Sequence, residues 1–382
     1  TTTTIGRIGR IVESDDIDYD WSDICWITYR RSLAEETLQK FADADIIPDE
    51  LAEPNRLRQS DLRYVGVTLH SAVMRAMNEV PPLVTDRDKV VFARDVLGVK
   101  YESGTPWRDG IGELFFSVLT WAKRNLLDPA DRADATPLQQ APAYDELKDR
   151  WGGDIVTAAQ RWEEFKRRGG ARYDADDIDP RDPEAPDPLE SYPDVLRRAL
   201  DGRLVPPTSV LVIDEYHDAY PLFAAVCEQW IRAHDIVIVA ADPDQVINSY
   251  RGADPELFRR LDLPEVDLGR SYRVPTEHYG AALRALAPSV ESLPEVRPAG
   301  SGSVIEVTCS EPMEYDRDRD KWVVPDPGTA GAPASVHRRI SEGGNTMHLC
   351  RTRQQVDAVS AALTPAGIPY QSQESDDWTR DV

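Results

Sequence analysis

The chain has 382 residues, with 44 Lys and Arg against 68 Asp and Glu, which gives a formal net charge of -24. This length favours two or three domains, and a hydrophobic content of 41% excludes a wholly disordered chain. No apolar run approaches the ~18 residues that a membrane-spanning helix needs, so we expect no membrane partner. The acidic total also argues against a nucleic-acid partner, because proteins that bind phosphates are usually basic.

The basic residues and the cysteines qualify that first impression. Only seven of the 44 basic residues are lysines, and an acid-rich, lysine-poor composition resembles that of halophilic proteins. The alternative is an ordinary acidic protein. In molar salt the Debye length falls to ~3 Å, so net charge then says little about partners. The four cysteines form no CxxC pair, which favours reduced thiols in a cytoplasmic protein over disulfides or a zinc site.

Six short apolar runs predict buried parallel strands, because each run is nearly continuous rather than alternating. They lie at 24–29, 64–68, 210–213, 236–241, 304–307 and 346–350. Helical patterns follow most of them. Ser32 with Glu35 fits a capping box after the first run, and Pro221 suits a first helical turn after the third. This alternation predicts an α/β fold with a mostly parallel sheet.

The pattern changes between about 105 and 203. The stretches 115–127 and 155–168 look helical, no strong strand occurs, and prolines among acids at 173–194 predict a mobile loop. We therefore expect a first α/β domain made of 1–105 and 203–267, a helical insertion at 106–202, and a second α/β unit at 268–382.

Polar residues directly follow five of the predicted strands or strand-like turns, where ligands bind in open parallel sheets. They are the segments 28–31, 68–70, 214–218, 242–245 and 271–273. Asp214 and Glu215 are two adjacent carboxylates after a buried strand, which suits a nucleotide hydrolase. The first can hold Mg²⁺, and the second can orient and deprotonate the attacking water. The alternative is an acidic loop in an acid-rich protein.

The later segments carry further candidates. Gln245 can touch a γ-phosphate or the attacking water, and Arg273 can stabilise the negative charge that develops in phosphoryl transfer. Tyr250 and Arg251 offer a ring and a cation for stacking on a base. Taken singly, each also fits a surface loop, a locally packed tyrosine or a surface arginine.

In order, the motif-bearing segments are ICWITYRRSLAEE, YVGVTLHS, RRGGARYDADDI, VLVIDEYHDAYPL, ADPDQVINSYRGA, LGRSYRVP and HLCRTRQQVDAVSAALTPAGIPYQ. Together they resemble the UvrD/Rep-type superfamily 1 DNA helicases over essentially the whole chain. VLVIDEYHDAYPL resembles the family's Walker B motif, usually DEFQD, and ADPDQVINSYRGA resembles GDxxQSIYxWRGA. The resemblance implies a RecA-like P-loop NTPase lobe with a parallel sheet, a helical insertion, and part of a second RecA-like lobe.

The resemblance also implies roles at the nucleotide. Asp214 would coordinate Mg²⁺, Glu215 would be the base, Gln245 would sense the γ-phosphate, Arg273 would be an arginine finger, and Tyr272 would stack on adenine. His217, on the nucleotide side, replaces the usual Gln of DEFQD. Two further departures are Ala241 for a Gly and Asn248 where a Tyr is usual.

No Walker A loop, GxxGxGKT, occurs in the sequence. TTTTIGRIGRIV fits the helix that follows GK in relatives, so Thr1 would be the threonine that ligates Mg²⁺. We therefore expect a fragment that begins after the essential lysine, stops before the family's later motifs, and alone hydrolyses ATP negligibly. The alternative is a complete protein that has lost ATPase function.

On the DNA side, the resemblance puts Tyr29 and Tyr250 at aromatic positions that stack on bases. The residues expected to contact phosphates or orient these rings are Thr28, Arg30, Thr68, His70 and Arg251. The basic stretch 162–172 fits either duplex contact or a helix end whose cations face the dipole.

The sequence thus predicts an ATP- and Mg²⁺-dependent helicase or translocase acting 3′→5′ on single-stranded DNA at duplex junctions, in repair or replication. A non-hydrolysing DNA-binding or scaffold subunit of a repair complex is one alternative, and a P-loop hydrolase unrelated to DNA is another. On this interpretation acids crowd the exterior, while Arg30, His70, Tyr250 and Arg251 line one groove.

Overall fold

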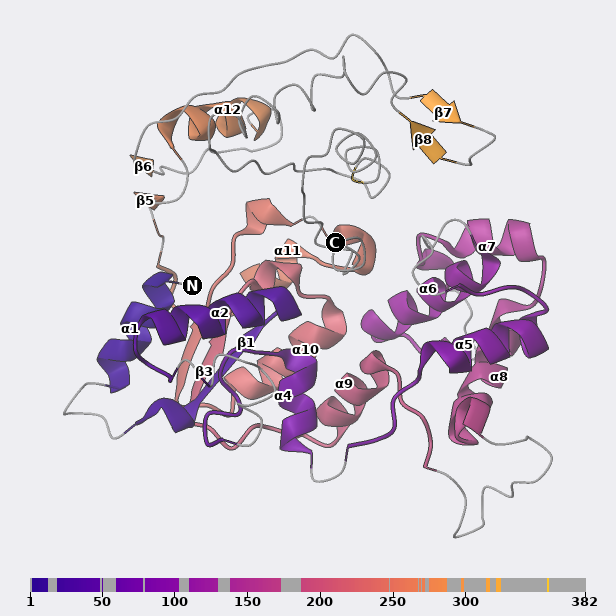
Figure 1. Ribbon diagram of the computed structural model, residues 1–382, viewed down its shortest axis with the longest axis horizontal. Coiled ribbons are helices and arrows are strands. Elements are labelled where there is room, and N and C mark those ends of the chain that lie inside the picture. Colours follow the sequence, from indigo (N-terminus) through magenta and orange to yellow (C-terminus); the bar gives the residue numbers. More distant parts are fainter. Residues whose placement is uncertain are drawn as a thin grey trace. The chain divides into compact units, whose positions relative to one another are not determined.

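The computed structural model describes residues 2–12, 19–48, 50, 60–77, 80–102, 110–129, 138–172, 187–246, 248–266, 268, 270–271, 275–286, 297–298, 314–316, 321–323 and 356. It divides into two compact units, Thr1–Leu263 and Pro264–Val382 (Figure 1). In the second unit the described elements are β5 (Arg270–Ser271), α12 (Thr276–Leu286), β6 (Arg297–Pro298), β7 (Glu314–Asp316) and β8 (Lys321–Val323). The strands expected at 304–307 and 346–350 lie outside the described residues, as does most of the loop expected at 173–194.

The first unit contains a four-stranded parallel sheet in the order β2-β1-β3-β4. Its strands are β1 (Ile24–Thr28), β2 (Val67–Thr68), β3 (Val210–Ile213) and β4 (Ile236–Val239). The prediction of an α/β fold with a parallel sheet is confirmed. The second and fourth predicted strands are shorter than expected, since β2 has only Val67 and Thr68 of the run 64–68, and β4 ends at Val239 in the run 236–241. β4 is only half-buried, because among the described strands it ends the sheet.

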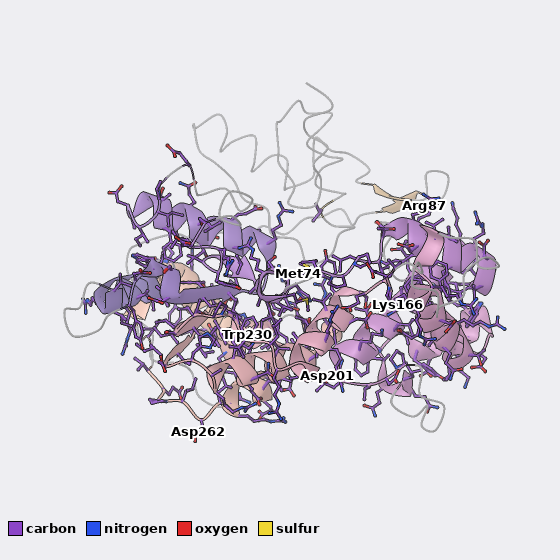
Figure 2. The ribbon with its side chains drawn as sticks, turned by 90° about the horizontal axis from the view of Figure 1, so that it is seen from below. Met74, Arg87, Lys166, Asp201, Trp230 and Asp262 are labelled. Atoms are coloured by element: carbon purple, nitrogen blue, oxygen red, sulfur yellow. The ribbon has the colours of Figure 1, made fainter. Side chains whose placement is uncertain are left out.

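Helices cover both faces of this sheet. They are α1 (Thr2–Val12), α2 (Arg31–Asp43), α4 (Leu69–Ala76), α9 (Tyr192–Asp201), α10 (Pro221–Ile231) and α11 (Pro255–Arg259). Successive strand side chains point to opposite faces, so Cys25 and Ile27 pack with α4, α9 and α10, while Ile24 and Trp26 pack with α1 and α2. Trp230 of α10 is fully buried among the first set (Figure 2).

The residues between α4 and α9 form a separate helical core. Its helices are α5 (Asp86–Phe92), the π-turn Ala93–Leu97, α6 (Ile111–Arg124), α7 (Tyr144–Trp151) and α8 (Ile155–Arg167). Phe92 lies at its centre, with its ring centroid 4.9 Å from Trp162 and 5.9 Å from Phe115. None of the helices in the described ranges combines the length and the apolar character needed to span a bilayer.

Two predicted helix starts have different outcomes. Pro221 occupies the first turn of α10, as predicted. The capping box at Ser32 and Glu35 is wrong, because α2 begins at Arg31, two residues earlier than a cap at Ser32 requires, and its N-cap Arg30 makes no side-chain capping bond. Ser32 therefore lies inside the first turn, and Glu35 instead pairs with Arg31, with 3.0 Å between Oε1 and Nε.

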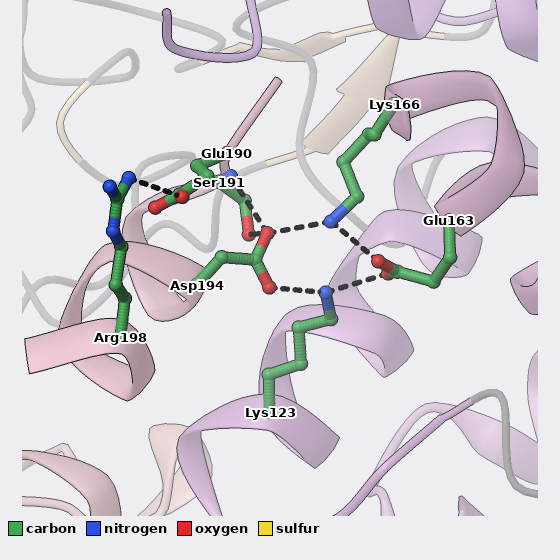
Figure 3. Close-up of polar contacts among 7 residues, drawn as sticks. All are labelled: Lys123, Glu163, Lys166, Glu190, Ser191, Asp194 and Arg198. Carbon is green, nitrogen blue, oxygen red and sulfur yellow. Dashed lines mark hydrogen bonds and ion pairs between the residues drawn. The ribbon is translucent and has the colours of Figure 1, made fainter. Parts of the chain in front are cut away.

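An ion cluster joins the helical core to α9 (Figure 3). The Lys123 ammonium of α6 lies 2.5 Å from one Asp194 oxygen, and the Lys166 ammonium of α8 lies 2.6 Å from the other. Glu163 closes the ring, at 2.6 Å from Lys123 and 2.7 Å from Lys166. Val195 and Leu196, next to Asp194, pack in the sheet's own core. The cluster therefore fixes the helical core to the sheet domain.

Candidate functional site

The carboxyl ends of the four parallel strands meet at one edge of the sheet, and backbone hydrogen bonds hold the segments that follow them together. The Asp214 amide donates to the Ile27 carbonyl at 2.9 Å, which links the end of β3 to that of β1. The Tyr216 amide donates to the Ala240 carbonyl at 3.0 Å, which links β3 to β4. The segments predicted after β1, β2, β3 and β4 are thus neighbours in space.

Asp214 and Glu215 stand at the end of β3. The Asp214 side chain is buried, and Glu215 is a left-handed residue with φ 60° and ψ 39°. A non-glycine residue costs about 1 kcal/mol or more in that conformation, and such strain concentrates at functional sites. Burial, followed by the charge of Asp214, raises the pKa of the Glu215 carboxyl. Glu215 therefore holds a proton more readily than an ordinary glutamate, as a general base must.

His217 connects Glu215 to the segment after β4. The 3-10 turn η6 (Tyr216–Asp218) buries its ring. The Asp242 amide donates to His217 Nδ1 at 3.1 Å, and His217 Nε2 lies 3.2 Å from Glu215 Oε2. Because Nδ1 accepts a hydrogen bond, the proton sits on Nε2 and faces the carboxylate. His217 is then a neutral ring that bridges two strand ends.

Gln245 is exposed and lies in the 3-10 turn η7 (Pro243–Gln245). Its side-chain amide donates to Asp242 Oδ2 at 2.6 Å, and its backbone amide donates to the Asp242 carbonyl at 2.9 Å. A continuous series of contacts therefore runs from Glu215 through His217 and Asp242 to Gln245.

Asp218 is a site residue that the sequence reasoning did not select. Its buried carboxylate accepts a hydrogen bond from Asn248 Nδ2 at 2.6 Å and lies 4.0 Å from Arg30 Nη2. Arg30 follows β1, and Asn248 precedes the 3-10 turn η8 (Ser249–Arg251). The sequence signal was the final acid of DEYHD together with the unusual Asn248, and only the fold shows that the two residues pair.

The residues after β1 have distinct positions. Thr28 is fully buried, and its hydroxyl donates to the Arg30 carbonyl at 3.1 Å, which shapes the turn that carries Tyr29. The Tyr29 ring packs on Phe223 with 5.7 Å between centroids, and burial raises the pKa of its hydroxyl. Arg30 keeps nearly half of its side chain exposed.

Thr68 and His70 lie at the start of α4. Thr68 is the N-cap, since its hydroxyl accepts from the Ser71 amide at 3.3 Å. The His70 ring packs edge-on against Tyr192 at 5.3 Å, and its buried Nε2 has no hydrogen-bond partner among the described residues. Burial, followed by the charge of Arg124, lowers the pKa of His70 to about 4, so the ring is neutral near pH 7.

Arg124 is a second residue that the sequence reasoning missed. It ends α6 in the helical core, and its guanidinium lies over the Tyr220 ring at 5.2 Å. Its charge also acts on the pKa of Tyr29 and of His70. No motif marks it, because its contacts come from elements far apart in the sequence.

The remaining predicted residues lie in or near segments outside the described part of the chain. Thr1, Tyr272 and Arg273 lie outside the described residues. Tyr250 and Arg251 are in η8, where Arg251 is exposed and the Tyr250 side chain lies outside the described part. In the basic stretch, Lys166 is buried in the ion cluster, while Arg167 and Arg168 pair with Glu164.

The residues present fit Mg²⁺ bound with a nucleotide. The described part of the chain holds no group of three or more His, Cys, Asp or Glu placed to bind a metal. Mg²⁺ commonly takes one or two carboxylates and completes its shell with phosphate oxygens and water. Asp214, beside Glu215 and Asp218, gives one such carboxylate in a locally acidic site.

A separate surface groove of about 570 Å³ lies between α8 and α9, away from these strand ends. Its arginines are already paired, Arg167 with Glu164, Arg197 with Asp201 and Arg198 with Glu190. This groove therefore does not look like an anion site.

Comparisons with known proteins agree with the motifs. Residues 194–263 match the UvrD/REP helicase N-terminal domain family. The chain is 27% identical over 283 residues to the ATP-dependent DNA helicase UvrD2 of Mycobacterium tuberculosis and to that of Mycobacterium bovis, which covers 69% of this chain and 36% of each relative. The chain thus spans about a third of the length of these relatives. The motifs, the parallel sheet and these matches agree with one another, so the chain is similar to the N-terminal part of UvrD/Rep-type helicases, and its sheet is consistent with a RecA-like lobe.

Proposed function

We propose that the protein acts as an ATP-dependent DNA helicase or translocase of the UvrD/Rep type, moving 3′→5′ on single-stranded DNA in repair or replication. The observation that carries this proposal is the single edge of the sheet where the acidic end of β3 meets the segments after β1 and β4. The name of the relatives, ATP-dependent DNA helicase, supports ATP and DNA as the substrates.

On the nucleotide side, Asp214 would hold Mg²⁺ and Glu215, with its raised pKa, would take a proton from the attacking water. Bound Mg²⁺ would supply positive charge at the transferring phosphate. His217 orients Glu215, and Gln245 would turn from Asp242 to the γ-phosphate. Thr1, Tyr272 and Arg273 keep their predicted roles as metal ligand, adenine platform and arginine finger.

On the DNA side, Tyr29 and Tyr250 would stack on bases, while Arg30 and Arg251 would meet phosphates and Thr28, Thr68 and His70 would hold the turns in place. We interpret 1–105 and 203–267 as the first motor lobe, 106–202 as its helical insertion, and 268–382 as part of a second lobe. Near the boundaries, α5 packs with the insertion helices and α9 packs on the sheet. Closure of two such lobes around ATP is the movement that would drive translocation.

The test joins the Walker A segment of a UvrD-type relative to the chain in front of Thr1 and measures ATP hydrolysis with and without single-stranded DNA. We expect DNA to stimulate hydrolysis, and Glu215→Gln to lower kcat by at least about 100-fold, the usual scale for loss of a general base. The matched control is Glu228→Gln on α10, which should leave the rate unchanged.

Two results would count against the proposal. Hydrolysis that DNA does not stimulate would favour a P-loop hydrolase unrelated to DNA. Tight DNA binding without hydrolysis in the joined protein would favour a non-hydrolysing DNA-binding subunit.

A further inference from the structure

We infer that His217 and Asn248 are positioning residues that clamp the turn after β3 to the segment after β4. The end of β3 with Asp214 and Glu215 and the η8 turn with Tyr250 and Arg251 then move together as one rigid unit. The inference rests on the proposed function only where its test measures DNA binding. Both residues stand where the family pattern quoted above has another side chain, but the argument depends on their contacts.

The first clamp is His217. It reaches Glu215 with Nε2 and the Asp242 amide with Nδ1, at 3.2 Å and 3.1 Å. The ring is buried, so each contact is shielded from water. Acceptance by Nδ1 requires the neutral ring, and one rigid side chain then fixes the distance between the two strand ends.

The second clamp is Asn248. Its side chain donates to the buried Asp218 carboxylate at 2.6 Å, and its carbonyl accepts from the Arg251 and Ala253 amides at 2.8 Å and 3.3 Å. One residue thus holds the backbone of η8 and ties it to η6. A displacement of Asn248 moves Arg251 with it.

The two clamps share η6, because His217 and Asp218 are consecutive. His217 faces the nucleotide-side residues Glu215 and Asp242, and Asp218 faces the DNA-side residues Arg30 and Asn248. A change in Glu215 or Asp242 is thereby passed through one 3-10 turn to the residues after β1 and before η8. This is a physical connection between the two halves of the proposed site.

The decisive experiment exchanges the partners of the second clamp. Asn248→Asp places two carboxylates against each other, whereas the double variant Asp218→Asn with Asn248→Asp restores one donor and one acceptor at the same total charge. The two readouts are the binding of a fluorescent oligothymidine to the 382-residue chain and the hydrogen exchange of the Arg251 and Ala253 amides. Asn248→Asp should weaken DNA binding at least about tenfold and speed that exchange, since an unpaired buried charge costs more than a hydrogen bond. The double variant should recover most of the DNA binding and most of the slow exchange at the Arg251 and Ala253 amides.

The first clamp is tested with a matched pair of substitutions. His217→Gln keeps one donor and one acceptor, and His217→Leu keeps the volume but neither. We expect near-normal exchange at the Asp242 amide in the Gln variant and faster exchange in the Leu variant. Equal exchange in the two variants would overturn the inference.

The outcomes separate the inference from the proposed function. If the wild-type chain does not bind oligothymidine, the DNA role fails, and the exchange data still test the clamps. If Asn248→Asp leaves exchange and binding unchanged, or the exchanged pair recovers neither while its melting temperature matches the wild type, the clamps are refuted. Should Asn248→Asp fail to fold, Asn248→Ala provides the same exchange measurement with a smaller perturbation.

Discussion

Replacing Asp194 with alanine should detach the helical core from the sheet domain at their shared ion cluster. Asp194 accepts from two ammonium groups at 2.5 Å and 2.6 Å, and its Oδ2 also accepts from the Ser191 amide at 2.8 Å to cap α9. Burial works to raise the pKa of Asp194, but the charges of Lys123 and Lys166 outweigh it, so this pKa lies well below its usual range.

The magnitude follows from what Asp194→Ala leaves behind. The Lys166 side chain is only 4% exposed, and among the described residues its remaining partner would be Glu163, which it shares with Lys123. Breaking a buried ion pair by removing one partner costs about 3–5 kcal/mol. Loss of the α9 cap adds about 1 kcal/mol. We therefore expect the free energy of unfolding of the first unit to fall by about 4–6 kcal/mol.

The assay is urea unfolding followed by circular dichroism, with hydrogen exchange of α6 and α8 as the local readout. Asp201→Ala is the matched control on the same helix, because the Asp201 side chain is 60% exposed and, among the described residues, pairs only with the exposed Arg197. That variant should cost about 0.5 kcal/mol, as exposed pairs do. Asp194→Asn, which keeps an acceptor for the cap but loses the charge, should fall between the two.

The pH dependence of the free energy of unfolding gives a second check, because the lowered pKa of Asp194 fixes the direction of the change. The folded pKa of Asp194 lies below its ordinary 3.8, so its contribution to stability is complete above that pH and is lost as the pH falls below it. If Asp194→Ala unfolds within 1 kcal/mol of Asp201→Ala, on the scale of an exposed pair, the argument that the cluster docks the helical core is refuted.

Three further predictions test other parts of the first unit. His70, with a pKa of about 4 against 6.5 when unfolded, should make the protein lose up to about 3 kcal/mol of stability as the pH falls from 6.5 to 4, and His70→Gln should abolish that part of the loss in acid unfolding curves. Gly252 has φ 96°, and an added Cβ would lie 2.8 Å from the Asn125 amide, so Gly252→Ala should lower the melting temperature, whereas Gly98→Ala, with a positive φ but open space, should lower it less. Cys25 and Cys227 are buried, which raises the pKa of both thiols, so neither should react with a thiol reagent until urea unfolds the protein; fast labelling in the native state would contradict their burial.

The local pattern of apolar and polar residues in the sequence determined much of the fold and the main candidate residues. The apolar runs at 24–29 and 210–213 are strands because continuous β-branched and aromatic residues suit a position buried on both faces. The carboxylates after β3 lie where the rule for parallel sheets puts ligands. The chain order of the motifs was enough to show the resemblance to UvrD/Rep-type helicases, since side-chain type and spacing are properties of the sequence itself.

Only the tertiary structure decided which of those residues touch. Asp218 and Asn248 are 30 positions apart, and nothing in local spacing says that they share a buried hydrogen bond. Arg124 lies over the Tyr220 ring because α6 packs near it, and Lys166 of the basic stretch 162–172 is buried in the ion cluster because α9 brings Asp194 to it. The net charge of -24 is a sum over the chain, whereas the interaction of any one charge depends on burial and on neighbours within a few ångströms, which folding alone sets.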